Sequence, residues 1–142
     1  MQHVGYRSLE HTSDAYLEAW GSSLEEAFEN AAKALFDTMV ELEKVEAVRE
    51  DSFEVEGEDL ESLLYNWLES LLIEFDSRGM VYGEFDVRIE RRDGGFRLSA
   101  RARGERFDLE KHGYKVGVKA VTYHLMKVEA DDTYRMRFLL DI

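Results

Sequence analysis

The segment from Leu60 to Phe75 constrains the fold of this chain more than any other part of the sequence. Asp59 is placed to cap a helix and Gly79 to end it, and apolar residues recur between them at helical spacing. A stripe this broad is typical of a helix in a protein core rather than of one that offers a groove to a partner. Its members are Leu60, Leu63, Leu64, Trp67, Leu68, Leu71, Leu72 and Phe75.

A second helix is predicted over residues 24–40. Ser23 lies three residues before Glu26, which is the spacing of a reciprocal capping box, and an apolar stripe follows from Leu24 to Met39. Alternating or β-rich runs predict strands elsewhere. These strands lie at residues 3–8, 15–20, 53–55, 116–123 and 134–140.

A β-hairpin is the clearest supersecondary pattern. Alternating runs at 85–90 and 96–102 flank the turn sequence Asp93-Gly94-Gly95. The element order β β α β α β β β β predicts an α+β two-layer domain, with a mixed or antiparallel sheet packed against two main helices. We identify no internal repeat and no linker, so residues 1–142 are expected to form a single domain.

Composition excludes several classes of protein. The chain has no cysteine, which excludes a disulfide framework, thiolate catalysis and a Cys-ligated zinc site and favours an intracellular, cytoplasmic location. It has neither a basic start followed by an apolar run nor an apolar stretch of about 18 residues, so no secretion or membrane association is expected. Side-chain amides are confined to Gln2, Asn30 and Asn66, and arginine outnumbers lysine 12 to 6. This usage resembles that of a thermophile, although the absence of proline does not.

Charge is distributed unevenly along the chain. The net charge is −13, yet residues 88–119 contain ten Lys or Arg against five Asp or Glu. On the second hairpin strand Arg97, Arg101 and Arg103 project from the face opposite the apolar residues. One interpretation is an RNA-binding module that uses this arginine face. The face lacks the interleaved aromatic residues that stack bases, and the whole molecule is strongly anionic.

The most site-like segment is the polar quartet His11-Thr12-Ser13-Asp14, which lies between two predicted strands. Ser, Thr and Asp also cap helices and close turns, so a purely structural role is an open alternative. The common nucleotide-binding, metalloprotease and hydrolase motifs are absent from the sequence. The four histidines are scattered, and a lone histidine is more often structural than a ligand.

Carboxylates near the two ends of the chain suggest a cation site. Asp141 lies beside the terminal carboxylate of Ile142, on a predicted strand that runs almost to the chain end. If the fold brought these groups near Asp14, all-oxygen ligation would select Ca²⁺, Mg²⁺ or Mn²⁺ over zinc. Spacing alone does not distinguish this site from a turn-capping Asp14 and a solvated Asp141.

Several motifs together resemble the archease family, in order and over essentially the whole chain. The chain departs from the family pattern at two places. It has Ser13 where the family more often has Ala, and Ala15-Tyr16 where the family more often has an aliphatic residue followed by Gly. His11 and Asp14 match the family. The motifs are His11-Thr12-Ser13-Asp14, Ala19-Trp20-Gly21, the run from Ser23 to Ala32, Leu35-Phe36-Asp37, Trp67-Leu68, the run from Lys119 to His124, and Asp141-Ile142.

The resemblance implies a non-enzymatic accessory protein of tRNA splicing. Archeases assist the GTP- and Mn²⁺-dependent ligase that joins a 2′,3′-cyclic phosphate or 3′-phosphate RNA end to a 5′-hydroxyl, and promote its guanylylation and multiple turnover. Some members are chaperone-like partners of a tRNA cytosine methyltransferase. By this resemblance the partner is the RNA ligase, and tRNA is contacted only indirectly.

The resemblance also implies site residues. The family's metal site maps to Asp14, Asp141 and Ile142, with Ca²⁺ as the first expectation and Mn²⁺ or Mg²⁺ as alternatives. Lys119 matches a lysine implicated in function, and His11 is a further functional candidate. No catalytic residue is expected.

Overall fold

The computed structural model describes residues 5–9 and 14–142, which form two antiparallel sheets and two long helices. One sheet has four strands in the order β1-β2-β7-β6, and the other has three in the order β3-β5-β4. The elements are β1 (Tyr6–Leu9), β2 (Ala15–Gly21), α1 (Leu24–Met39), η1 (Leu42–Lys44), β3 (Arg49–Gly57), α2 (Leu60–Arg78), β4 (Met80–Arg92), β5 (Gly95–Arg106), α3 (Leu109–His112), β6 (Ala120–Ala130) and β7 (Tyr134–Asp141).

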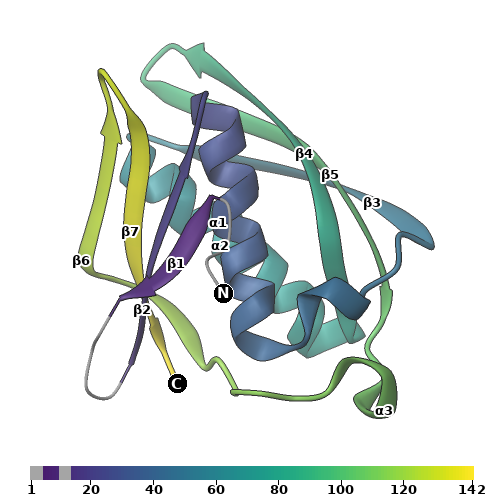
Figure 1. Ribbon diagram of the computed structural model, residues 1–142. Coiled ribbons are helices and arrows are strands. Elements are labelled where there is room, and N and C mark those ends of the chain that lie inside the picture. The colour runs from purple at the N-terminus through teal and green to yellow at the C-terminus, as the bar shows by residue number, and fades with distance from the viewer. Residues whose placement is uncertain (1–4, 10–13) are drawn as a thin grey trace.

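Both long helices lie between the two sheets. Figure 1 shows the four-stranded sheet on the left, the three-stranded sheet on the right and α1 and α2 between them. Helix α1 contacts β2 and β4, and α2 contacts β3 and β6, so each helix packs against both sheets. The predicted α+β class with antiparallel strands and two main helices is confirmed.

The number of layers differs from the prediction, because the strands divide between two sheets and give three layers instead of two. Helix α1 explains the difference, since residues buried on it cover more than half of its circumference at about 100° per residue. One sheet covers only one side of such a helix. The buried residues of α1 are Ala27, Phe28, Ala31, Ala32, Ala34, Leu35, Phe36 and Met39.

Aromatic side chains connect the two helices to the three-stranded sheet. Phe53 of β3 contacts Trp67 of α2 edge to face, with ring centroids 5.8 Å apart, and Tyr82 at 5.7 Å. The indole Nε1 of Trp67 donates to the main-chain oxygen of Phe28 in α1 at 3.1 Å. That bond satisfies the polar atom of a fully buried tryptophan, and it joins α1 to α2.

Both helices begin and end close to where the sequence predicts. The Ser23 hydroxyl accepts from Glu26 N at 3.1 Å, and the Asp59 carboxylate accepts from Ser62 N at 2.7 Å. Helix α2 ends at Gly79, whose φ of +66° is left-handed and therefore favours glycine. The predicted caps at Ser23, Asp59 and Gly79 are confirmed. The Glu26 carboxylate, however, accepts from Ser22 N instead of completing the reciprocal box at Ser23.

Each long helix follows a strand through the same short connection. A Cβ on Gly21 would lie 2.7 Å from Ala27 N, and a Cβ on Gly57 would lie 2.5 Å from Leu63 N, so only glycine fits at either strand end. The side chain of Asn30 then donates to Trp20 O at 2.8 Å, and that of Asn66 donates to Glu56 O at 2.7 Å. Both asparagines of the chain therefore have the same structural role: each connects a helix to the strand that precedes it by a side-chain to main-chain hydrogen bond.

The two connections belong to two nested βαββ units, the inner one of which is continuous in sequence. It comprises β3, α2, β4 and β5, with strand order β3-β5-β4. The outer unit comprises β2, α1, β6 and β7, with the matching order β2-β7-β6, and the inner unit is inserted after α1. The prediction of no internal repeat is therefore wrong, because the insertion separates the two halves of the outer copy.

Several strands have limits that differ from the prediction: β3, β4 and β5 extend beyond the predicted residues 53–55, 85–90 and 96–102. The first strand begins at Tyr6, and His3 to Val4 of the predicted strand lie outside the described residues. Val116 and Val118 precede β6 instead of belonging to it, in a segment where Lys115 N donates to Met39 O at 2.7 Å. No helix among the described residues is long and apolar enough to span a membrane.

The asparagine bonds make a paired prediction. Asn30→Ala is expected to lower the free energy of unfolding by about 1–3 kcal/mol, because it leaves the partly buried Trp20 carbonyl without its donor. Asn66→Ala removes the equivalent bond at an exposed position and should cost about 1 kcal/mol or less. Urea denaturation of both variants tests this, and equal losses would contradict it.

Candidate functional site

The pairing of β2 with β7 brings Asp14 and Asp141 to the same end of the four-stranded sheet. Ala15 lies opposite Leu140, and the register extended by one residue places Asp14 opposite Asp141. Side chains of directly opposed residues lie on one face with Cβ atoms about 4.5–5.5 Å apart. Because Leu17 and Ala19 face the helices, Asp14 and Asp141 lie on the outer face, away from the core.

Strand β6 brings Lys119 to the same place. Ala120 lies opposite Asp141, and Lys119 N donates to Asp141 O at 2.7 Å. The Lys119 side chain is exposed, and the half-buried Ile142 packs against the core next to Asp141. The structure thus gathers Asp14, Lys119, Asp141 and Ile142 at one sheet end, whereas His11, Thr12 and Ser13 lie outside the described residues.

The donor set at this end fits a hard divalent cation. Two carboxylates and an oxygen of Ile142 supply only oxygen ligands, as Ca²⁺, Mg²⁺ and Mn²⁺ prefer. Within residues 5–9 and 14–142 no three His, Cys, Asp or Glu side chains form a metal-binding group. Protein side chains alone therefore do not complete a coordination shell here, and Ile142 and further ligands from water or a partner are needed.

A model of the archease protein family matches residues 6–142. The chain belongs to the archease family. It is 54% identical to the protein archease of Pyrococcus abyssi over 124 aligned residues, and this aligned part covers 87% of each chain. It is 49% identical to that of Thermococcus gammatolerans, over 96% of this chain and 98% of the relative. Archeases are non-catalytic accessory proteins of RNA processing, so the expectation that the chain is not an enzyme is confirmed.

A solved structure supports the fold. The solution structure of protein 1598 of Methanobacterium thermoautotrophicum matches with a TM-score of 0.82 and 39% identity, over 97% of this chain and 99% of the other. The archeases of Pyrococcus and Thermococcus come from thermophilic organisms, in accord with the amide-poor composition. The resemblance inferred from the motifs is therefore confirmed.

A bulge in β6 reshapes the middle of the outer face of this archease. The register with β7 shifts between Thr122 and Lys127, and Leu125 adopts a φ of +59° that is rare outside glycine. The Tyr16 hydroxyl donates to Leu125 O at 3.1 Å. Leu139 is only 4% exposed although its strand position faces outward, between Tyr16 on β2 and Thr122 on β6. No feature of the sequence predicted this bulge.

Further along the same face, three arginines surround a buried glutamate. The Glu18 carboxylate accepts from Arg7 Nε at 2.7 Å, Arg137 Nε at 2.9 Å and an η nitrogen of Arg135 at 3.3 Å. Glu18 is fully buried, whereas the three arginines are each 40–50% exposed. Burial by itself raises the pKa of Glu18, but hydrogen bonds from Arg137 and Arg7 outweigh it, so its pKa lies below the usual range. Arg7, Arg135 and Arg137 are called the outer-face arginine cluster below.

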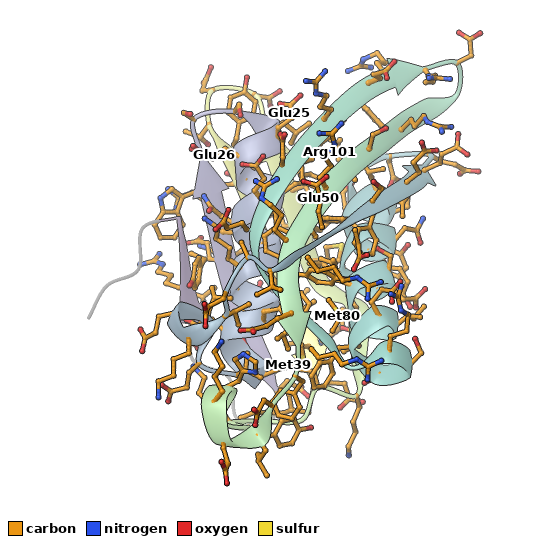
Figure 2. All side chains as sticks on the ribbon, turned by 90° about the vertical axis from the view of Figure 1, so that its right-hand side faces the viewer. Glu25, Glu26, Met39, Glu50, Met80 and Arg101 are labelled. Atoms are coloured by element: carbon orange, nitrogen blue, oxygen red, sulfur yellow. The ribbon has the colours of Figure 1, made fainter. Side chains whose placement is uncertain are left out.

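The arginine face predicted from the hairpin is not basic as a whole. Arg103 pairs with Glu50 at 3.2 Å and Glu84 at 3.3 Å, and Arg97 pairs with Glu54. Figure 2 faces this sheet and shows carboxylates interleaved with the guanidinium groups around the labelled Glu50 and Arg101. Two of the three arginines of this face, Arg97 and Arg103, are thus paired with glutamates of neighbouring strands, which weakens the support for RNA binding here.

His112 has the structural role expected of a lone histidine. It is fully buried, its Nδ1 accepts from Asp108 N at 2.9 Å, and its Nε2 lies 2.9 Å from the Glu105 carboxylate. Burial raises the pKa of Glu105, but hydrogen bonds from Lys111, the Glu46 main chain and His112 outweigh it and lower the pKa to about 2. This network holds the segment after β5 against the body.

The lowered pKa of Glu105 predicts a pH dependence. The stabilisation from ionised Glu105 is fully present above its unfolded pKa of about 4.5 and is lost as the pH falls towards 2. Glu105→Gln should therefore lower the melting temperature at pH 7, and the difference from the unaltered protein should shrink between pH 4.5 and 2. Glu110→Gln, an exposed neighbour, is the matched control. A difference that stays constant over this pH range would contradict the assignment.

Proposed function

We propose that this archease acts in the cytoplasm as an activator of a tRNA-splicing RNA ligase, promoting guanylylation and multiple turnover. The observation that carries the proposal is the convergence of Asp14, Asp141 and Lys119, from three strands, at one end of the four-stranded sheet. Family membership supports a role beside an RNA-processing enzyme.

In this proposal Asp14, Asp141 and Ile142 hold a divalent cation, Ca²⁺ in the first instance and Mn²⁺ or Mg²⁺ as alternatives. A bound cation would neutralise phosphate or carboxylate charge where the archease meets the ligase. Asp14 directly precedes β2, and the register of β2 and β7 extended by one residue places it opposite Asp141. Such a placement favours a preorganised site over two independent surface acids.

Lys119 is held beside the cation ligands by its main chain, and its side chain is exposed. An ammonium group next to two carboxylates is suited to contact the γ- or α-phosphate oxygens of a nucleotide on the ligase, because it carries no acceptor of its own. The net charge of −13 also favours encounter with a basic, RNA-binding cleft.

The first test uses the two aspartates. Asp14→Asn and Asp141→Asn are expected to weaken Ca²⁺ or Mn²⁺ binding at least about tenfold in calorimetry, because each removes a charged ligand. The same variants should lose most of their stimulation of ligase guanylylation, measured across Mn²⁺, Mg²⁺ and Ca²⁺. Asp131→Asn and Asp132→Asn change the same charge at the opposite end of the sheet and should behave like the unaltered protein. Folded Asp14 and Asp141 variants that stimulate fully would refute the proposal.

The second test separates Lys119 from the cation. Lys119→Ala keeps the main-chain bond to Asp141 and should therefore retain the fold and the cation affinity. Stimulation of guanylylation should fall several-fold if the ammonium contacts the ligase or its nucleotide. Lys127→Ala, an exposed lysine on the same strand, is the control. Unchanged stimulation by Lys119→Ala would remove this residue from the proposed mechanism.

A further inference from the structure

The outer face of the four-stranded sheet carries a cluster of arginines around Glu18, separate from the end of the sheet where Asp14 and Asp141 lie. None of the described helices covers this face, since α1 and α2 pack on its opposite side (Figure 1). Glu18 and Arg137 lie opposite each other on β2 and β7. This pair is four residues along the strands from Asp14 and Asp141, a distance of about 13 Å at 3.3 Å per residue.

The outer-face arginine cluster is preorganised. Arg7 and Arg137 each donate to Glu18 through Nε, and their side chains are 50% and 44% exposed. The fully buried Glu18 fixes these guanidinium groups in place before any ligand arrives. An anion that binds them therefore immobilises fewer free side chains, which improves affinity.

The cluster is locally positive on an acidic protein. Three arginines face one glutamate, and the neighbouring outward pair Lys127 and Glu129 on β6 is neutral in sum. The three arginines and Glu18 together carry a charge of +2, and Asp132, which lies near Arg135, reduces the local charge to +1. Because charges beyond about 8 Å are largely screened at physiological ionic strength, the acids elsewhere on the molecule weaken this patch only partly.

Aromatic side chains accompany these arginines. Trp20 is next outward from Glu18 on β2, and the Arg135 guanidinium lies 5.7 Å from the centroid of its ring. A hollow of about 240 Å³ adjoins Trp20, and its wall contains both Arg135 and the acidic residue Asp132. Tyr16 lies on the other side of Glu18, so aromatic residues flank the arginine cluster along one strand.

We propose that this face binds a single-stranded segment of RNA, with phosphates at Arg7, Arg135 and Arg137 and a base stacked on Trp20. Proteins that bind single-stranded nucleic acids combine basic groups with aromatic rings on which bases stack, and Trp20 and Tyr16 are partly exposed beside the arginines. An acidic protein segment would use the arginines but not the ring faces. The inference goes beyond the proposed function, in which RNA is contacted only through the ligase, and it does not depend on that function.

The test measures RNA binding without the ligase. Fluorescence anisotropy with a labelled oligouridylate of about 12 nucleotides, within the usual range of site sizes, gives the affinity and its salt dependence. The triple variant Glu18→Gln/Arg7→Gln/Arg137→Gln removes two positive charges and one negative, so no buried charge is left unpaired. Its affinity should fall tenfold or more, and the slope of log affinity against log salt should decrease by about 1.4, for two lost phosphate contacts.

The matched control makes the same charge change on the other sheet. Glu50→Gln/Arg97→Gln/Arg103→Gln should alter RNA affinity less than twofold. Trp20→Ala keeps the main-chain bond to Asn30 and should weaken binding about fivefold or more. Circular dichroism establishes that each variant is folded.

Crosslinking of the unaltered protein keeps the proposal testable if the triple variant does not fold. An oligonucleotide containing 5-bromouridine should form adducts at Trp20 or Tyr16, and not at the exposed Tyr123 on β6. Absence of RNA binding, equal losses in the two triple variants, or adducts elsewhere would overturn the proposal. Competition by polyglutamate as strong as that by RNA would also overturn it, in favour of an acidic protein segment.

Discussion

The rest of this structure depends on one constraint, which is that each of the two long helices is covered by a sheet on two opposite sides. Helix α1 is buried over more than half of its circumference, and the indole of Trp67 bonds it to α2. Helix α2 contacts strands of both sheets and leaves a face with Ile73 exposed to solvent. Two sheets are needed to cover the pair, and their inner faces are committed to the core. The groups for which recognition is proposed, Asp14, Asp141 and the outer-face arginine cluster, lie on the outer face and at the end of the four-stranded sheet.

The two nested units use similar residues in opposite arrangements on their outer faces. In the outer unit a glutamate, Glu18, is at the centre and arginines surround it. In the inner unit an arginine, Arg103, is at the centre and glutamates flank it. The first arrangement leaves a net positive, partly exposed surface, and the second leaves a net negative one. A charge count along the sequence does not reveal this inversion, because the partners come from different strands.

Sequence patterns predicted the elements that are determined locally. The caps at Ser23 and Asp59, the stop at Gly79 and the hairpin through Asp93-Gly94-Gly95 all depend on residues within a few positions of each other. The pairing of Asp14 with Asp141 depends instead on the register of strands at opposite ends of the chain. The residues alone raised it as an open possibility, and the family resemblance implied it. The buried Glu18 and the β6 bulge had no local pattern at all. The repeated Gly21/Asn30 and Gly57/Asn66 spacing was present in the sequence and was missed.

The nesting of one unit inside the other also sets an order for folding. The inner unit is contiguous and can form as soon as β5 has been synthesised, whereas β2 must wait for β7, almost the whole chain later. Until then one side of α1 and α2 is exposed, and a partly made chain is prone to aggregate. The end of the sheet that carries Asp14, Lys119 and Asp141 is assembled in the last step. A nascent or misfolded molecule therefore cannot display this surface, and any partner that recognises it selects fully folded protein.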